Sequence, residues 1–355
     1  MPLNVAIIGA GLSGLACAHR LTQLGVTPRV FEEDREVGGF FPVAEALLEV
    51  LYRPVDDPLR ALAERYDLYV HPQQSITRFV LESTHERAVL EGFRGFVLMR
   101  GRYPDSLERQ MARQVEVPIE YGPTDLRSIA RESDYVVVAT GDPKVVSQVQ
   151  PWYRDLSGQL AVATIHGSFL PREALVWFGR DFAPEGYGFL LPWSGDQATL
   201  SIAVPEHVGD VEVLWQRFLP RLDFDFEVDD VKTIHNFQSG HVEKNRIGNF
   251  LFVGNAGGTL MPFMGFGIWD SLLSGFWAAE AIVQKKDFNR MMRPIAASYR
   301  RSLGMRRLFA RLHDPGLDRL VRMLGAPLGQ WLVTRSRLDV LKWAGTVAAL
   351  GVRDT

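Results

Sequence analysis

The chain has 355 residues, of which 46% are hydrophobic and 23% charged, so it is long enough to bury a large core and to form two domains. Its formal net charge of -3 disfavours general nucleic-acid binding. Its single cysteine, Cys17, excludes an internal disulfide and disfavours a zinc site. No apolar run reaches the roughly 18 residues of a membrane-spanning helix, and we expect no signal peptide. The sequence therefore predicts a cytoplasmic protein without a metal site.

Residues 5–32 carry the most informative motif of the chain. A short apolar run is followed by three glycines, a helical stretch and a second apolar run that ends on Glu32. This order is the dinucleotide-binding fingerprint: Gly9 permits a tight turn, Gly11 lets the backbone approach a pyrophosphate, and Gly14 lets helix and strand pack closely. The helix N-terminus offers N–H groups to the phosphates, and Glu32 can accept hydrogen bonds from a ribose. The segment therefore predicts a nucleotide-binding unit.

Two further blocks of strand and glycine indicate which nucleotide is bound. Residues 134–141 form an apolar run that ends in Ala-Thr-Gly, and residues 249–258 form another that ends in Gly-Asn-Ala-Gly-Gly. With the Gly-Gly pair at 38–39, these blocks resemble the FAD-binding segments of flavoprotein reductases and amine oxidases. The resemblance implies that the nucleotide is FAD. It also implies that a helix from about 269 to 283 points its N-terminus at the flavin ring, where the helix dipole stabilises the reduced flavin.

The fingerprint and the resemblance together assign cofactor-binding roles to residues at these turns. They are Gly9, Gly11, Leu12, Ser13, Gly14, Glu32, Glu33, Gly39, Phe40, Arg100, Thr140, Gly141, Gly254, Asn255, Gly265, Gly267 and Ile268. Asn255 stands where the resembling proteins have aspartate, and its amide can still bond a ribityl hydroxyl. No second GxGxxG motif occurs, so we expect no separate Rossmann domain for NAD(P)H. The electrons then come either from NAD(P)H that binds without such a domain or from an electron-donor protein.

Between the nucleotide-binding blocks the pattern changes to strands. The candidate strands are 75–82, 88–90, 160–165, 174–178, 188–191 and 198–204. They predict an antiparallel sheet that is inserted into the nucleotide-binding domain and forms the floor of a substrate cavity. The expected fold class is α/β, with a Rossmann-type FAD domain, an inserted antiparallel-sheet substrate domain and a C-terminal helical segment. The expected boundaries are 1–73, 100–145 and 240–290 for the FAD domain, 74–99 and 146–239 for the substrate domain, and 291–355 for the C-terminal region.

The C-terminal region, 291–355, is strongly basic. It contains twelve Lys or Arg residues against four Asp residues, a charge of +8, so the remainder carries -11 of the total of -3. Apolar residues recur at helical spacing between 303 and 324. Such a basic amphipathic region fits contact with an anionic membrane surface, here the inner face of the membrane. It fits equally well a helical subdomain that packs on the body and leaves a solvated basic face.

Residues 184–193 resemble a segment of one particular flavoprotein family. Their sequence, Pro-Glu-Gly-Tyr-Gly-Phe-Leu-Leu-Pro-Trp, resembles the YxWxFP segment of the geranylgeranyl reductase family, and Arg100 before a helix at 107 is also similar to that family. The resemblance implies FAD-dependent hydride transfer to C=C bonds of an isoprenoid or other lipid-like substrate. It implies that the lining of the substrate site includes Tyr187, Phe189, Leu191, Pro192 and Phe263. Tyr187 is then the candidate catalytic proton source, and a core tyrosine with a satisfied hydroxyl is the alternative.

Departures from the family keep two other functions open. Phe189 and Leu191 replace the family's Trp and Phe, and the Cys-Gly that follows the family's Gly-Gly is absent. A flavin-dependent monooxygenase or oxidase shares the expected fold, but the residues after Ala-Thr-Gly lack the Asp-Gly pair of such hydroxylases. A degenerate, flavin-bearing binding protein would account for Asn255 and the missing Cys-Gly. Oxygen dependence separates the first two functions, and absence of flavin or turnover would indicate the third.

Overall fold

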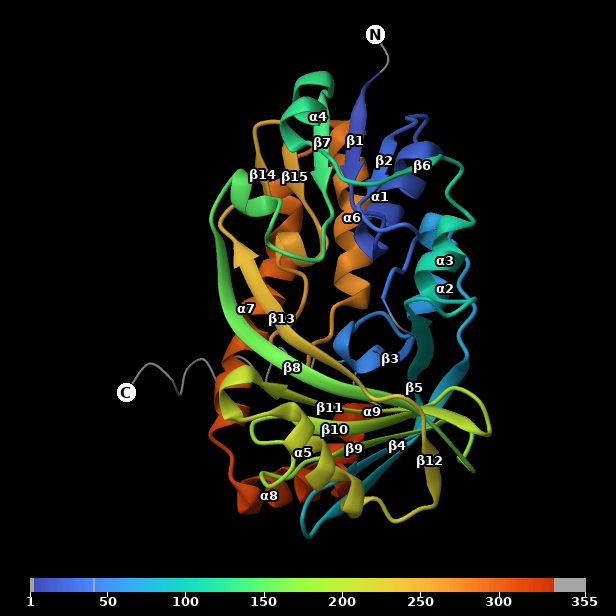
Figure 1. The fold of residues 1–355 in the computed structure, drawn as a ribbon, viewed down its shortest axis with the longest axis vertical. Helices are drawn as coiled ribbons and strands as arrows, with labels where there is room; N and C mark the ends of the chain where they lie inside the picture. Colours follow the sequence, from blue (N-terminus) through green and yellow to red (C-terminus); the bar gives the residue numbers. More distant parts are fainter. Residues whose placement is uncertain (1–2, 41, 335–355) are drawn as a thin grey trace.

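The computed structural model describes residues 3–40 and 42–334, which form two β-sheets with their helices (Figure 1). The smaller sheet lies in the upper half of the figure and the larger one in the lower half. Short 3-10 helices stand at several of the connections: η1 (Glu49–Leu51), η2 (Val146–Gln148), η3 (Glu206–Val208), η4 (Leu219–Arg221) and η5 (Gly254–Gly257). The arrangement confirms the α/β class and the Rossmann-type domain that the sequence predicts.

The smaller sheet has six strands. In spatial order they are β14 (Arg246–Ile247), β15 (Phe250–Phe252), β7 (Tyr135–Val138), β1 (Val5–Ile8), β2 (Arg29–Glu32) and β6 (Ile119–Tyr121). All neighbours pair in parallel except β14 with β15. The chain leaves β1 for β2 on one side, whereas β7 and β15 are added on the other. The strand order therefore changes direction between β1 and β7, which is the place where open parallel sheets bind ligands.

Two long helices of this half pack tightly against each other. The helices here are α1 (Leu12–Gln23), α2 (Pro58–Tyr66), α3 (Leu107–Ala112), α4 (Leu126–Glu132) and α6 (Ile268–Gln284). Helices α1 and α6 approach so closely that a Cβ added at Gly275 of α6 would overlap the backbone carbonyl oxygen of Ser13. The glycine is therefore required by packing, and the contact fixes the start of α6 relative to the start of α1.

Gly275→Ala is expected to lower the free energy of unfolding by about 1–3 kcal/mol, because the added methyl must push the two helix backbones apart. Denaturant unfolding of the purified protein measures this loss. Gly195→Ala is the control, since a Cβ at Gly195 meets no atom within 4 Å. Equal stability of both variants would show that the α1–α6 contact is not as close as described.

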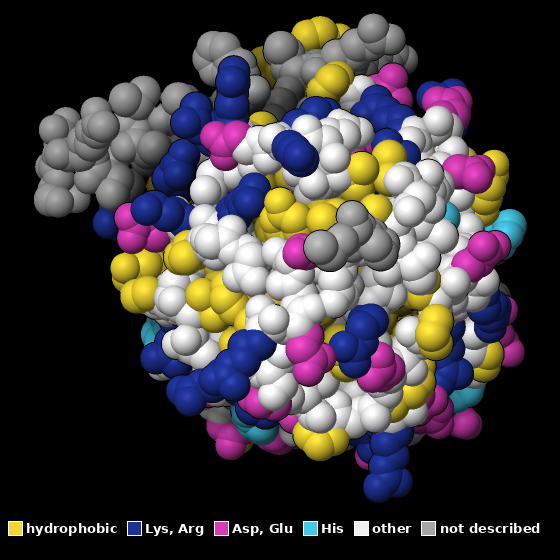
Figure 2. All heavy atoms as spheres, turned by 90° about the horizontal axis from the view of Figure 1, so that it is seen from above, with side chains coloured by type: hydrophobic (Ala, Val, Ile, Leu, Met, Phe, Trp, Pro, Cys, Tyr) yellow, Lys and Arg dark blue, Asp and Glu magenta, His cyan; other side chains and the backbone are white. Residues whose placement is uncertain are grey.

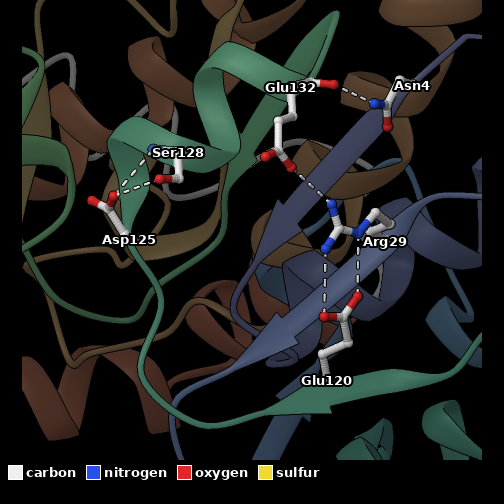
Figure 3. Close-up of polar contacts among 6 residues, drawn as sticks. All are labelled: Asn4, Arg29, Glu120, Asp125, Ser128 and Glu132. Carbon is white, nitrogen blue, oxygen red and sulfur yellow. Dashed lines mark hydrogen bonds and ion pairs between the residues drawn. The ribbon is translucent and has the colours of Figure 1, made fainter.

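Polar contacts join the outer strands of the smaller sheet to α4 (Figure 3). Arg29 of β2 pairs with Glu120 of β6 at 3.2 Å and with Glu132 of α4 at 3.5 Å. Asp125 caps α4 by accepting hydrogen bonds from the backbone and hydroxyl of Ser128, which hold the pKa of its carboxyl below the ordinary range. These side chains are exposed, so the ion pairs add little stability and serve mainly to align the sheet edge.

The upper face of the molecule carries charges of both signs. Figure 2 shows Lys and Arg side chains interspersed with Asp and Glu over the part of this face that the structure describes.

The larger sheet has nine strands. They are β12 (Phe226–Val228), β8 (Trp152–Gly167), β11 (Gln197–Pro205), β10 (Tyr187–Pro192), β9 (Glu173–Trp177), β4 (Gln74–Glu82), β5 (Arg87–Arg100) and β3 (Val43–Leu48), in spatial order, with β13 (Lys232–Val242) also paired to β8. The six strand segments that the sequence predicts all lie in it. The pairing is antiparallel except between β4 and β9, which run parallel.

Strand β3 departs from the expected boundaries. The sequence places residues 43–48 in the FAD-binding part, but they pair with β5 at the edge of the larger sheet. Ala44, Leu47 and Leu48 are buried there. Five of its six residues are apolar, but the run is short and its partner strand comes from later in the chain, so its pairing leaves no local signal.

Helices cover both faces of the larger sheet. Helix α5 (Val211–Phe218) buries Trp215 and Phe218 on one face. Helix α7 (Phe288–Ala310) leads to α8 (Asp314–Gly325) and α9 (Pro327–Thr334) on the other face. Asp318 of α8 accepts hydrogen bonds from Ser83 and His85, which follow β4. The basic region is thus a packed helical subdomain up to residue 334, and the rest of it lies outside the described residues. No helix in the described part is long and apolar enough to cross a membrane.

Candidate functional site

The predicted glycine turns meet at one edge of the smaller sheet. Gly9 follows β1, Gly141 follows β7, Gly254 follows β15, and Glu32 ends β2. These carboxyl ends of the strands face the larger sheet (Figure 1). Gly9 has a φ of 104°, and a Cβ there would lie 2.7 Å from the carbonyl oxygen of Ala139, so only glycine fits. The structure therefore brings the predicted cofactor-binding turns together at the point where the strand order reverses.

The start of α1 is open and has no side-chain cap. Gly11 is the N-cap residue, and a Cβ added to it would meet no protein atom within 4 Å. No side chain caps the helix, so the N–H groups of its first turn, which begins with Leu12 and Ser13, remain available to a phosphate. Gly14 lies one turn further on, where a Cβ would overlap the carbonyl oxygen of Gly9. Gly9 and Gly14 thus have no room for a Cβ, whereas Gly11 faces open space.

The two acidic residues at the end of β2 have different surroundings. Glu32 accepts hydrogen bonds from the backbone N–H groups of Ala10 at 2.7 Å and Asp34 at 3.1 Å, which fix its carboxylate beside the start of α1. Glu33 points to the surface, where it pairs with Lys144 at 3.2 Å. Glu32 is thus held at the start of α1, whereas Glu33 joins the surface loops that follow β2 and β7.

Arg100 takes part in a buried ion-pair cluster. Its guanidinium donates to Glu45 of β3 and to Glu108 of α3, each at 2.6 Å. Burial acts to lower its pKa, but the two carboxylates outweigh burial and raise the pKa above the ordinary range. The ring of Phe40 lies 5.8 Å from the guanidinium carbon, just after Gly39. The protein itself therefore supplies two anionic partners for the arginine that the family resemblance assigns to FAD.

Asn255 connects the loops after β7 and β15. Its amide nitrogen donates to the carbonyl oxygens of Gly141 at 2.8 Å and Gln238 at 2.9 Å. Its Oδ1 is buried and has no hydrogen-bond partner among the residues that the structure describes. The hydroxyl of Thr140, beside Gly141, donates a hydrogen bond to the carbonyl oxygen of Asp142. An amide is needed at 255 because a carboxylate would face two carbonyl oxygens, and the orphaned Oδ1 can accept a bond from a ligand hydroxyl.

Asn255→Asp is therefore expected to lower the free energy of unfolding by about 1–3 kcal/mol at neutral pH, because two donated bonds become oxygen–oxygen repulsions. Urea unfolding measures the loss. Asn249→Asp is the control: the amide of Asn249 makes one long bond, to the carbonyl of Ser133 at 3.4 Å, so its loss should be smaller. A stable Asn255→Asp protein would contradict the donor role.

The loop before α6 is held between two elements. Gly265 has a φ of 71°, Met264 has a φ of 61°, and Gly267 is the N-cap of α6, which Ile268 begins. The Tyr187 hydroxyl of β10 donates to the carbonyl oxygen of Met264 at 2.6 Å. On the other side, Ser302 of α7 accepts a bond from the backbone N–H of Phe263 at 2.9 Å. These bonds fix the loop at the junction of the two sheets.

Strand β10 presents an apolar face to this loop. Tyr187, Phe189 and Leu191 alternate along the strand and therefore share a face. Tyr187 and Phe189 pack in one apolar cluster with Phe263 and with side chains of β4, β5 and β9. Pro192 lies two residues after Leu190 and therefore on the same face of the strand. The Leu190 side chain packs toward α5 on the opposite face of the sheet, so Pro192 is separated from the other three residues. Four of the five predicted substrate residues therefore lie on one side of the sheet.

Tyr187 is partly buried, and loss of solvent together with the charge of Glu45 raises the pKa of its phenol. Its one proton is engaged with the Met264 carbonyl. This geometry favours a positioning role for Tyr187 over the proton-source role.

Sequence reasoning missed one acidic residue at the junction of the sheets. Asp270 lies in the first turn of α6, and burial raises the pKa of its carboxyl to about 7. The available signal was an acid in the first turn of a mostly apolar helix, three residues after Gly267. Among the described residues, no group of three or more His, Cys, Asp or Glu side chains could hold a metal ion.

Comparison with known proteins finds solved structures whose fold is similar to that of this chain. Residues 7–44 match a family model described as an NAD(P)-binding Rossmann-like domain, and no curated protein matches the sequence. The fold is similar to that of a geranylgeranyl bacteriochlorophyll reductase-like protein from Thermoplasma acidophilum, with 15% identity and a TM-score of 0.72 over 100% of this chain and 97% of that one. It is also similar to a flavin-dependent brominase, with 16% identity and a TM-score of 0.69 over 99% and 98% of the two chains. A flavin-dependent halogenase gives 18% identity and a TM-score of 0.66 over 100% of this chain and 74% of its own. The chain therefore has, over its whole length, the fold that these proteins share.

Proposed function

We propose that this protein is an FAD-dependent oxidoreductase that reduces C=C bonds of an isoprenoid or other lipid-like substrate. The observation that carries the proposal is the apolar face of β10, with Tyr187, Phe189 and Leu191, beside the edge where the glycine turns meet. An alkene needs such a lining, because hydride transfer to carbon requires a dry site and a substrate held flat at near-attack distance.

The residues at the sheet edge fit FAD. Gly11 leaves a cradle that a Cβ would fill, and the start of α1 offers N–H groups to a pyrophosphate. Glu32 is fixed where a ribose diol would follow, and the orphaned Oδ1 of Asn255 suits a ribityl hydroxyl. The N-terminus of α6 adds a positive dipole end near Gly267. When bound, FAD supplies the hydride; the protein holds it, excludes water and delivers a proton.

The electron supply and the place of action belong to the same proposal. The electron donor is either NAD(P)H, which reaches the flavin without a separate binding domain, or an electron-donor protein. We place the protein at an anionic membrane surface, since α8 and α9 expose Met323, Leu328 and Trp331 beside the exposed Arg319. Such a surface gives a lipid substrate a route to the site.

Leu328→Ser with Trp331→Ser is expected to weaken binding to vesicles that contain anionic lipid by about a hundredfold or more, since each apolar side chain that enters the membrane contributes roughly 1.5–3 kcal/mol. Vesicle co-sedimentation measures the change. Leu170→Ser, an equally exposed leucine before β9, is the control. Binding that survives both changes, or that ignores salt, would contradict this placement.

A second function, an oxygen-dependent flavoenzyme, is favoured by the whole-chain similarity to a flavin-dependent brominase. The two functions differ in what consumes the reduced flavin. The FAD-loaded protein should therefore be reduced with dithionite and incubated with a geranylgeranyl lipid under nitrogen and under air, with product mass as the readout. A saturated product under nitrogen supports the reductase; an oxygenated or halogenated product that forms only under air overturns it.

A further inference from the structure

Trp193 carries a hydrogen-bond donor that the protein leaves without a partner. It follows strand β10 directly, and its indole Nε1 is buried with no hydrogen-bond partner among the residues that the structure describes. Two other indoles show the usual arrangement. Trp177 donates to Glu82 at 2.8 Å, and Trp152 donates to the backbone oxygen of Asn255 at 3.4 Å. A buried indole N–H normally has such an acceptor, because water does not reach it. The Trp193 N–H is therefore open to an acceptor that a ligand brings.

Trp193 lies on the apolar face that the proposed function uses. It continues the two-residue spacing that places Tyr187, Phe189 and Leu191 on that face. It packs in one apolar cluster with Phe189 and Leu191, and the same cluster contains Phe266, one residue before the N-cap of α6. The side chains of Trp193, Phe189 and Phe266 are only partly buried. The indole thus stands at the end of the apolar face that lies opposite Tyr187, in contact with the loop at the cofactor edge.

The surroundings hold the indole in place. The backbone N–H of Trp193 donates to the carbonyl oxygen of Gln197 at 3.1 Å, which closes the turn after β10. The ring of Tyr103 lies 5.6 Å from the indole at an angle of 69°. The face of a ring is a weak acceptor, so this contact orients the indole without replacing an oxygen. A ligand oxygen therefore meets a donor that is already ordered.

The charges beside this cluster disfavour an anionic ligand. Arg100 pairs with both Glu45 and Glu108, so these three side chains carry one formal negative charge in excess. Glu45 follows Ala44, which packs in the same apolar cluster as Trp193. A phosphate or carboxylate would be repelled here, whereas a neutral oxygen would not. Since an indole N–H only donates, the group that it binds must be an acceptor.

We propose that the Trp193 N–H donates a hydrogen bond to a neutral oxygen at one end of the substrate, the hydroxyl of an isoprenoid alcohol. This role rests on the proposed function. The indole takes no part in the bond changes of the reaction. It fixes the polar end of the chain, while the rings of the apolar face contact the C=C bonds. The site therefore prefers the alcohol to the hydrocarbon of the same chain and to the diphosphate.

Trp193→Phe tests the role, because a phenyl ring keeps the apolar contact and lacks the N–H. Calorimetric titration of the FAD-loaded, oxidised protein compares geranylgeraniol with the hydrocarbon that lacks only its hydroxyl. The smaller ring weakens both ligands alike, so the ratio of the two affinities reports the hydrogen bond. The preference for geranylgeraniol should fall by about 5- to 10-fold in the variant. The wild type should bind geranylgeranyl diphosphate less tightly than geranylgeraniol.

Trp177→Phe is the matched control. It removes an indole N–H whose partner, Glu82, lies within the protein, so it should keep the wild-type preference. Nuclear magnetic resonance of nitrogen-labelled protein gives a second readout. The indole N–H signal that Trp193→Phe removes should move downfield when geranylgeraniol is added to the wild type, and it should stay in place with the hydrocarbon.

The possible results separate the two proposals. If Trp193→Phe keeps the preference for the alcohol, or if the Trp193 signal stays in place, the role of Trp193 is wrong and the proposed function stands. If the diphosphate binds more tightly than the alcohol, the substrate class is wrong. If geranylgeraniol moves the signal but is left unreduced under nitrogen, the proposed function fails and the hydrogen bond stands as that of a ligand site.

Discussion

Gly11→Val is expected to weaken FAD binding at least a hundredfold, or about 2.7 kcal/mol, without unfolding the protein. Gly11 is the N-cap of α1, with φ of −79° and ψ of −172°, a conformation that valine adopts without strain. An added Cβ touches no protein atom within 4 Å, so the new side chain enters only the space that a pyrophosphate would occupy. Fluorescence titration of the apoprotein with FAD measures the affinity.

Two controls make this result specific. Gly195→Val should bind FAD normally, because Gly195 is equally open but lies in a turn after β10. Gly14→Val should unfold the protein, since its Cβ would overlap the Gly9 carbonyl oxygen. A Gly11→Val protein that binds FAD as tightly as the wild type would show that the pyrophosphate does not lie against the start of α1.

Asp270 should make the protein less stable as pH rises. Its pKa is about 7 in the folded protein and near 3.8 when unfolded, so between these values the folded chain holds a proton that the unfolded chain has lost. Stability is therefore highest below pH 4 as far as this group is concerned, and it falls as pH rises from about 4 to 7. The full difference corresponds to about 4 kcal/mol, an upper limit for one carboxyl.

Asp270→Asn should remove that part of the pH dependence. Relative to the wild type, the variant should gain stability between pH 5 and pH 8 in urea unfolding of the cofactor-free protein. Glu280→Gln, which loses an ion pair with Arg20, should show no such relative gain. Parallel stability curves for wild type and Asp270→Asn would mean that Asp270 ionises normally in the folded protein.

The nucleotide-binding half could be predicted because its signals are local. The fingerprint at Gly9, Gly11 and Gly14 specifies strand, turn and helix within a few residues, and β1, α1 and β2 form as expected. The apolar helix expected at 269–283 is α6. Strand β10 was predicted as a strand-type run at 188–191, whereas the role of Phe189 in lining a substrate site followed from the family resemblance.

The polar contacts of the site could not be predicted, because each joins residues that are far apart in the sequence. Arg100 meets Glu45 across the β3–β5 pair, and Asn255 meets Gly141 across two parallel strands. The same holds for Asp270, whose protonation depends on burial at the junction of the sheets. Parallel and edge pairings bring such residues together without a local sequence pattern.

The most direct test of the account is the stoichiometry of flavin reoxidation by an alkene without oxygen. The FAD-loaded protein is reduced under nitrogen, mixed with a geranylgeranyl lipid and followed by flavin absorbance and by product mass. The account predicts that each flavin reoxidised saturates one C=C bond. A flavin that stays reduced with the lipid and reoxidises only when oxygen is admitted would contradict it.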